Sequence, residues 1–86
     1  MTDEALENYR RKVRWQMRRG LLELDIILNR FIADGFAALN EAELRCLEEI
    51  LTWDDQDLLQ IVSGLKTVEE PLQAAIIQKI RNSNAA

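Results

Sequence analysis

Apolar residues recur every three or four positions along most of this chain, which is the spacing of one face of an α-helix. The first such segment covers residues 3–19. Acidic residues stand at its start and basic residues at its end, so both ends complement the helix dipole. The pattern predicts an amphipathic helix followed by Gly20, in the place of a left-handed C-terminal cap. The apolar face of this helix comprises Leu6, Tyr9, Val13 and Met17.

A second helix is predicted over residues 21–34, and its apolar face is broad, as in an element packed against a core. Gly35 follows the last apolar turn. We expect Gly35 to end the helix by the same left-handed cap as Gly20. The apolar positions are Leu21, Leu24, Ile27, Leu28, Phe31 and Ile32.

The third helix has a clear N-terminal signal. Asn40 is a favoured N-cap residue and Glu43 follows three positions later, which is close to a capping-box arrangement. Apolar positions then repeat to about Thr52, where the predicted helix ends. The residues expected to face inward are Leu44, Leu47, Ile50 and Leu51.

Two further helices complete the pattern. Either aspartate of residues 54–55 can cap a short fourth helix, which Gly64 ends. The last helix has two alternative starts: a capping box formed by Thr67 and Glu70, or a first turn that begins near Glu70 with Pro71. In both cases the buried stripe is expected to consist of Leu72, Ile76 and Ile80.

No segment shows the sustained alternation of a β-strand, and no glycine-rich phosphate loop is visible. We therefore expect an all-α fold, a single compact bundle of about five short helices that forms one domain over residues 1–86. The short connections favour sequential, roughly antiparallel packing. The ends, about residues 1–3 and 82–86, are expected to fray.

Composition restricts the chemistry. The 86 residues include no histidine and one cysteine, Cys46. Without imidazole the chain has no general base near neutral pH, no His ligand for a transition metal, and no Ser/His or Cys/His pair. A single cysteine also excludes a CxxC site, so Cys46 is interpreted as a small core residue. An enzyme is the least favoured class, and no catalytic or metal-binding residue is predicted.

Charge is unevenly distributed. The formal net charge is −4, yet six of the 11 basic residues fall within residues 10–19. This basic helix, which contains Trp15, leaves open a small helical nucleic-acid-binding module as the alternative function. The sequence isoelectric point of about 4.8 argues against it, because such domains are more often strongly basic.

The N-terminal stretch MTDEALE is acidic and lacks the apolar run of a secretory signal. The apolar runs of the chain are interrupted by charges far short of the ~20 residues that cross a bilayer. We therefore predict a cytoplasmic protein without membrane contact.

The stretch RRGLLELD, residues 18–25, has two interpretations. If the helix continues through Gly20, Arg19 and Glu23 form an ordinary surface pair at i,i+4. If the chain turns at Gly20, the missing side chain permits close approach of another backbone, flanked by a guanidinium group and a carboxylate. The residues alone leave both interpretations open.

The pattern Arg19-Gly20-x-x-Glu23, which follows a basic helix containing Trp15, resembles the RGxxE signature of the SdhE/YgfY family. The later stretch LTWDDQDLLQIV is similar to the DDxDL segment of that family, with Gln56 where proline is common. The similarity covers most of residues 9–66. RGxxE alone is a weak pattern, but its position together with DDxDL makes the resemblance specific.

The resemblance implies a five-helix bundle that assists covalent attachment of FAD to the flavoprotein subunit of succinate dehydrogenase, and in bacteria of fumarate reductase. The attachment residue is a histidine of the flavoprotein, so FAD is the cofactor of the client protein. The resemblance further implies that Arg19, Gly20 and Glu23 form the flavoprotein-binding motif. Further candidates for that surface are Trp15, Arg18 and Asp25. The choice of client, binding of free FAD and the oligomeric state stay open.

Overall fold

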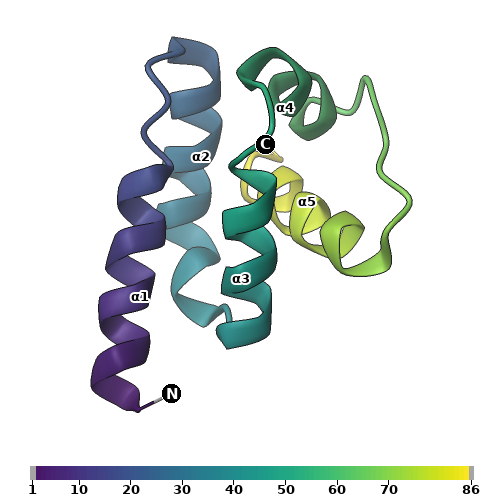
Figure 1. Cartoon of the computed structure of the whole chain (residues 1–86). Helices are drawn as coiled ribbons and strands as arrows, with labels where there is room; N and C mark the ends of the chain where they lie inside the picture. The colour runs from purple at the N-terminus through teal and green to yellow at the C-terminus, as the bar shows by residue number, and fades with distance from the viewer. Residues whose placement is uncertain (1, 86) are drawn as a thin grey trace.

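Five α-helices and one 3-10 turn make up the computed structural model, which describes residues 2–85 (Figure 1). The all-α prediction is confirmed. The elements are α1 Asp3–Gln16, α2 Leu22–Asp34, the 3-10 turn η1 Phe36–Ala38, α3 Glu41–Ile50, α4 Asp55–Val62 and α5 Pro71–Ser83.

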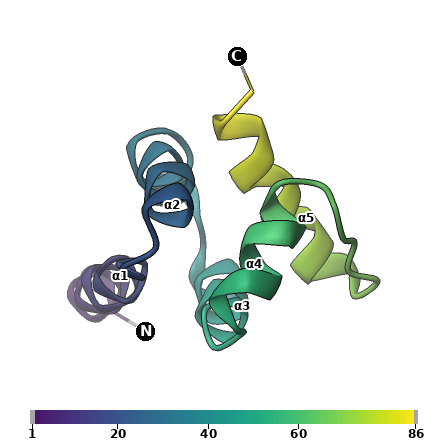
Figure 2. The same ribbon diagram turned by 90° about the horizontal axis from the view of Figure 1, so that it is seen from above.

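Helix α2 runs roughly antiparallel to α1 and to α3, as expected from the short connections, so α1 and α3 point in the same direction (Figure 1). Seen along their axes in Figure 2, α1, α2 and α3 stand at three corners of the bundle, and α5 lies across the side formed by α2 and α3. Helix α4 packs on α2 and α5. This arrangement brings the end of α1 and the start of α4 to the same end of the bundle.

The core lies between the five helices and, within residues 2–85, every buried side chain is apolar. Val13, Leu24 and Phe31 are fully buried, in agreement with the predicted faces. Cys46 is also buried, as expected for a core residue. The prediction for Leu72 is wrong: its side chain is 38% exposed, and Ile77 is buried in the stripe of α5 beside Ile76 and Ile80.

Local caps decide where three helices begin. Asn40 and Glu43 form the predicted capping box of α3, with Asn40 Oδ1 accepting from the Glu43 N–H at 2.8 Å. Asp54 caps α4. Helix α5 begins at Pro71 with Glu70 as its N-cap, because the Glu70 carboxylate accepts from two backbone N–H groups of the first turn. The alternative start at Thr67 is therefore wrong.

Two glycines end helices by different means. Gly64 has φ +86°, and the N–H groups of Gly64 and Leu65 donate to carbonyls of the last turn of α4, as in a Schellman motif. Gly35 has φ −110°, so the predicted left-handed cap there is wrong. The preference for glycine at position 35 is explained by lack of space, because a Cβ there would lie 3.0 Å from the Phe31 ring.

Residues near both ends of the described chain make hydrogen bonds, and the fraying expected at about residues 1–3 and 82–86 stays a prediction. The Thr2 hydroxyl accepts from the Ala5 N–H and caps α1. At the other end, Ser83 donates to Asp34, and the Asn84 amide donates to the carbonyl of Ile27. The expectation for residues 1 and 86 lies outside the described residues. No helix within residues 2–85 is long and apolar enough to span a membrane.

Candidate functional site

The chain turns between α1 and α2, so the first interpretation of RRGLLELD, a continuous helix, is wrong. Helix α1 ends at Gln16, three residues earlier than predicted, and Gly20 lies beyond it with φ +79°. Asp25, in the first turns of α2, accepts a hydrogen bond from the Arg19 N–H at 2.9 Å. This bond holds the connection between α1 and α2 against the start of α2. We call residues 17–21 the docking turn.

Gly20 is exposed and faces open space. A Cβ built on it would meet no atom within 4 Å, so nothing inside the protein requires the missing side chain. The positive φ alone favours glycine at this position. The exposed face of Gly20 is therefore free for close approach of another molecule.

The Arg19 guanidinium lies across the end of α1 and contacts α4. Its Nε donates to Asp55 Oδ1 at 2.9 Å, in an ion pair whose side chains are 19% and 34% exposed. Its terminal nitrogens donate to the carbonyls of Gln16 at 3.3 Å and Trp53 at 3.4 Å. Arg19 thus joins the two stretches that carry the family resemblance, RGxxE and DDxDL.

Asp55 is the site residue that sequence reasoning missed. The sequence indicated Asp55 as one of two alternative caps for α4 and as part of the DDxDL segment, but not as a site residue, and Asp54 is the cap. The signal was present in the paired aspartates, since one cap needs only one of them. Arg19 and Asp55 are 36 positions apart in the sequence, so no local pattern indicates their contact.

Glu23 lies in the first turn of α2 and is exposed. Within residues 2–85 its carboxylate has neither an ion pair nor a hydrogen bond, whereas its expected i,i+4 partner Arg19 pairs with Asp55. A carboxylate at this position is compatible with the helix dipole. Its acceptor capacity is free for a partner.

Trp15 lies on the outer side of the last turn of α1, and Arg18 belongs to the docking turn that follows it. Trp15 is 69% exposed, an unusual value for the largest side chain. The Arg18 guanidinium lies 5.1 Å from the centre of the Trp15 ring, within cation–π range. The two further candidates Trp15 and Arg18 are thus in contact, while Asp25 is half-buried and bonded to the turn itself.

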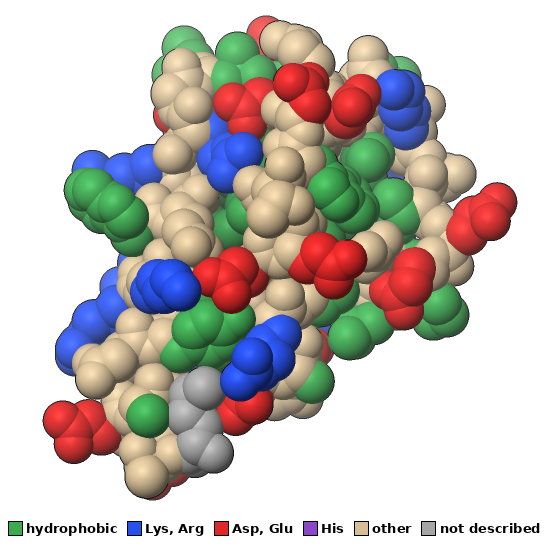
Figure 3. All heavy atoms as spheres, in the orientation of Figure 1, with side chains coloured by type: hydrophobic (Ala, Val, Ile, Leu, Met, Phe, Trp, Pro, Cys, Tyr) green, Lys and Arg blue, Asp and Glu red, His purple; other side chains and the backbone are tan. Residues whose placement is uncertain are grey.

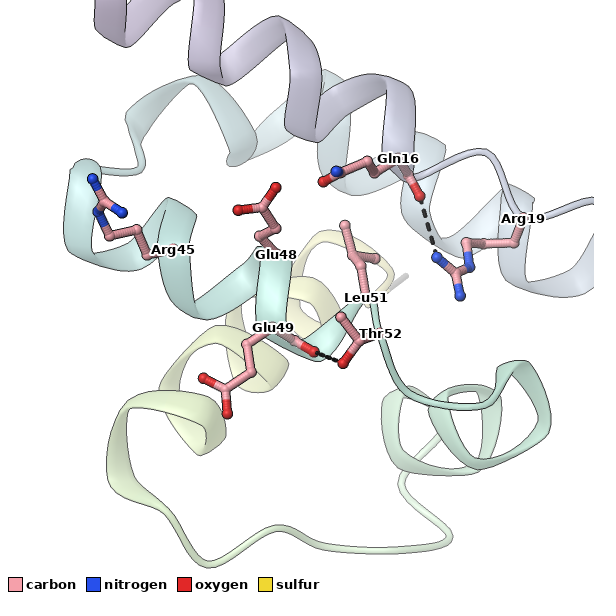
Figure 4. A pocket seen from close by; sticks show the side chains of 7 residues that line it. All are labelled: Gln16, Arg19, Arg45, Glu48, Glu49, Leu51 and Thr52. Atoms are coloured by element: carbon pink, nitrogen blue, oxygen red, sulfur yellow. Dashed lines mark hydrogen bonds between the residues drawn. The ribbon is translucent and has the colours of Figure 1, made fainter.

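A hollow of about 590 Å³ lies between α1 and α3, with Arg19 at one end and Arg45 at the other (Figure 4). Gln16 and Glu48 point toward each other across it (Figure 4). Between the same two helices, nearer the N-terminus of α1, Tyr9 Oη donates to Glu48 Oε1 at 2.8 Å. Burial and this hydrogen bond raise the pKa of Tyr9 to about 12, and the bond lowers the pKa of the Glu48 carboxyl. This pair fixes α1 against α3.

Outside the docking turn, the groups that could bind a metal ion or act as a nucleophile are the carboxylates and the Cys46 thiol. Within residues 2–85 no group of three His, Cys, Asp or Glu side chains is arranged to hold a metal ion. Burial raises the pKa of the Cys46 thiol, which disfavours the reactive thiolate. The fold and the docking turn define a small all-α protein whose distinguishing surface is a charged turn with an open glycine.

Residues 11–84 match the family described as "Sdh5: Flavinator of succinate dehydrogenase", and the chain belongs to this family. Curated relatives share its length. The "FAD assembly factor SdhE" of Vibrio parahaemolyticus is 41% identical over 69 residues, which is 80% of each chain. That of Coxiella burnetii is 38% identical over 71 residues, 83% of this chain and 87% of the relative. The resemblance stated from RGxxE and DDxDL is confirmed.

A third relative, the "FAD assembly factor SdhE" of Legionella pneumophila strain Lens, is 38% identical over 68 residues, 79% of this chain and 85% of its own. The nucleic-acid-binding alternative finds no support among these relatives. No solved structure matches the chain.

Proposed function

We propose that this chain is an assembly factor that binds the flavoprotein subunit of succinate dehydrogenase, or of fumarate reductase, and promotes covalent attachment of FAD to that subunit. The description of the family and the names of the relatives support the proposal. The observation that carries it is the docking turn, where an open glycine with a left-handed backbone stands between Arg19 and the unpaired Glu23.

Each of the three motif residues has a role that follows from its surroundings. Gly20 admits the backbone of the flavoprotein, since no side chain keeps it at a distance. Asp55 and two backbone carbonyls hold the Arg19 side chain in place. Because this side chain is already ordered, it loses little conformational entropy when the flavoprotein binds. Glu23 accepts hydrogen bonds from donors of the flavoprotein.

The proposed mechanism is positioning. Binding at the docking turn favours the flavoprotein conformation in which the flavoprotein histidine and FAD are aligned. No residue of this chain takes part in bond formation, and FAD remains the cofactor of the flavoprotein. The cytoplasmic location expected from the sequence stays a prediction.

The test compares two glycine variants in cells that express the flavoprotein and lack the endogenous factor. Gly20→Ala and Gly64→Ala both place an alanine at positive φ, at a cost of about 1–2 kcal/mol. At Gly64 the new Cβ also lies 3.0 Å from the Arg81 guanidinium, so this control is destabilised at least as much. Covalent flavin is measured as fluorescence of the denatured flavoprotein on a gel.

We expect Gly64→Ala to sustain flavinylation and Gly20→Ala to reduce it by about tenfold, the effect of overpacking a close contact. Arg19→Ala is expected to reduce it as well. Equal flavinylation by Gly20→Ala, Arg19→Ala and the unaltered chain would contradict the role of the docking turn. Unchanged covalent flavin in cells that lack this protein would contradict the function itself.

A further inference from the structure

A second surface lies on the outer side of α1 and extends into the docking turn, and its residues have helical i, i+3, i+4 and i+7 spacing. All four side chains are exposed and line a shallow hollow of about 230 Å³. Figure 3 shows Lys and Arg side chains gathered along the α1 side of the molecule. We call this surface the basic-aromatic stripe: Arg11, Arg14, Trp15 and Arg18.

The three arginines of the stripe have no carboxylate partner within residues 2–85. Arg11 donates to the amide oxygen of Asn8, Arg14 lies 5.7 Å from the centre of the Phe36 ring, and Arg18 stacks on Trp15. An acidic chain with 15 Asp and Glu residues therefore leaves three neighbouring positive charges uncompensated.

The other basic residues of the same segment behave differently. Arg10 pairs with Glu7, Lys12 with Glu48, and Arg19 with Asp55. Whether a basic residue of this segment is ion-paired therefore depends on its side of the helix. The arginines without an ion pair all lie on the side that carries the exposed Trp15.

Like charges on one helix face repel each other, and an anionic partner relieves this repulsion. Exposed tryptophan and arginine are the residue types that most often dominate binding at protein interfaces. The combination indicates a surface for a protein segment that is both acidic and partly apolar.

We propose that the basic-aromatic stripe, which shares Arg18 with the docking turn, binds an acidic segment of the flavoprotein client. The proposal rests on the proposed function and adds the chemistry of the partner segment. A nucleic acid is disfavoured because residues 34–86 carry 10 acidic and 4 basic side chains, and an extended phosphate backbone would be repelled by them. A short acidic segment contacts the stripe alone and so avoids repulsion by those acidic residues.

The experiment measures the dissociation constant between the purified chain and the purified apo-flavoprotein by isothermal titration calorimetry, at low and at physiological salt. The variants are Arg11→Glu/Arg18→Glu and Trp15→Ala. The matched control is Arg81→Glu, an exposed arginine on α5 with no ion pair within residues 2–85. Poly-L-glutamate and a DNA duplex serve as competitors, and thermal unfolding of each variant checks its fold.

We expect the double charge reversal to weaken binding by about tenfold or more and to reduce its salt dependence. Trp15→Ala is expected to weaken binding by about 30-fold, and Arg81→Glu by less than about twofold. Poly-L-glutamate is expected to compete and the DNA duplex to have no effect. If the double reversal does not fold, Arg18→Gln replaces it, with an expected loss of about threefold.

Three outcomes overturn the proposal, and they differ from one another. Unchanged binding by the double reversal and by Trp15→Ala, together with a loss in Gly20→Ala, leaves the docking turn as the contact and removes the stripe. Charge-dependent binding of the DNA duplex in place of the flavoprotein assigns the stripe to nucleic acid. Absence of any binding between the unaltered chain and the flavoprotein overturns the proposed function as well.

Discussion

The ion pair between Arg19 and Asp55 makes a prediction that can be worked from the structure. Replacing Asp55 by alanine removes the carboxylate that lies 2.9 Å from Arg19 Nε. The guanidinium is then left with two longer bonds, to carbonyls at 3.3 and 3.4 Å. Because the Arg19 side chain is only 19% exposed, solvent replaces the lost partner incompletely.

The expected loss lies between that of an exposed ion pair and that of a buried charged hydrogen bond, about 1–2 kcal/mol in the free energy of unfolding. For a chain of this size, such a loss lowers the melting temperature by about 5–15 °C. Asp55 also stands in the first turn of α4, so part of the loss belongs to the helix dipole. A double-mutant cycle with Arg19→Gln separates the two contributions.

The assay is urea unfolding followed by circular dichroism for the unaltered chain, Asp55→Ala, Arg19→Gln and the double variant. We expect a coupling energy of about 1 kcal/mol that decreases at high salt. A coupling energy below about 0.3 kcal/mol, within the limits of additivity for independent sites, would refute the inference that this pair holds Arg19.

Three further predictions concern the site and the core. Glu23→Gln is expected to change the free energy of unfolding by less than about 0.5 kcal/mol, because the carboxylate has no partner within residues 2–85, and yet to lower covalent flavin in the co-expression assay. Tyr9→Phe is expected to cost about 1 kcal/mol near neutral pH. Since the pKa of Glu48 is lowered in the folded state, the contribution of its carboxylate is present above the unfolded pKa and is lost as pH falls through the folded value. Urea titrations across the acidic range should therefore show the difference between Tyr9→Phe and the unaltered chain shrinking, and a constant difference would contradict it. Leu28→Ala, at a fully buried position, is expected to cost about 3–5 kcal/mol, whereas Leu22→Ala, 74% exposed on the same helix, should change stability by less than about 0.5 kcal/mol in the same denaturation assay.

The amino-acid sequence by itself determined the helices and most of their ends. Spacing by three and four residues is a local property, so the faces that contain Val13 and Leu24 were readable without a structure. Caps are local as well, since Asn40 and Glu43 satisfy each other across three residues. The motif residues of the candidate site were also named from the sequence, through the family resemblance.

Only the tertiary structure decided what those motif residues contact. Whether Arg19 pairs with Glu23 or with Asp55 depends on how α4 packs against the end of α1. No local sequence pattern indicates how far Arg19 lies from Asp55. The same reason explains the two wrong predictions for Gly35 and Leu72. A Cβ at Gly35 would crowd the Phe31 ring. Leu72 lies in the first turn of α5 and is exposed, although Ile76 and Ile80 of the same stripe are buried. Side-chain periodicity encodes which face is apolar, whereas the partners of polar groups are set by the packing of distant helices.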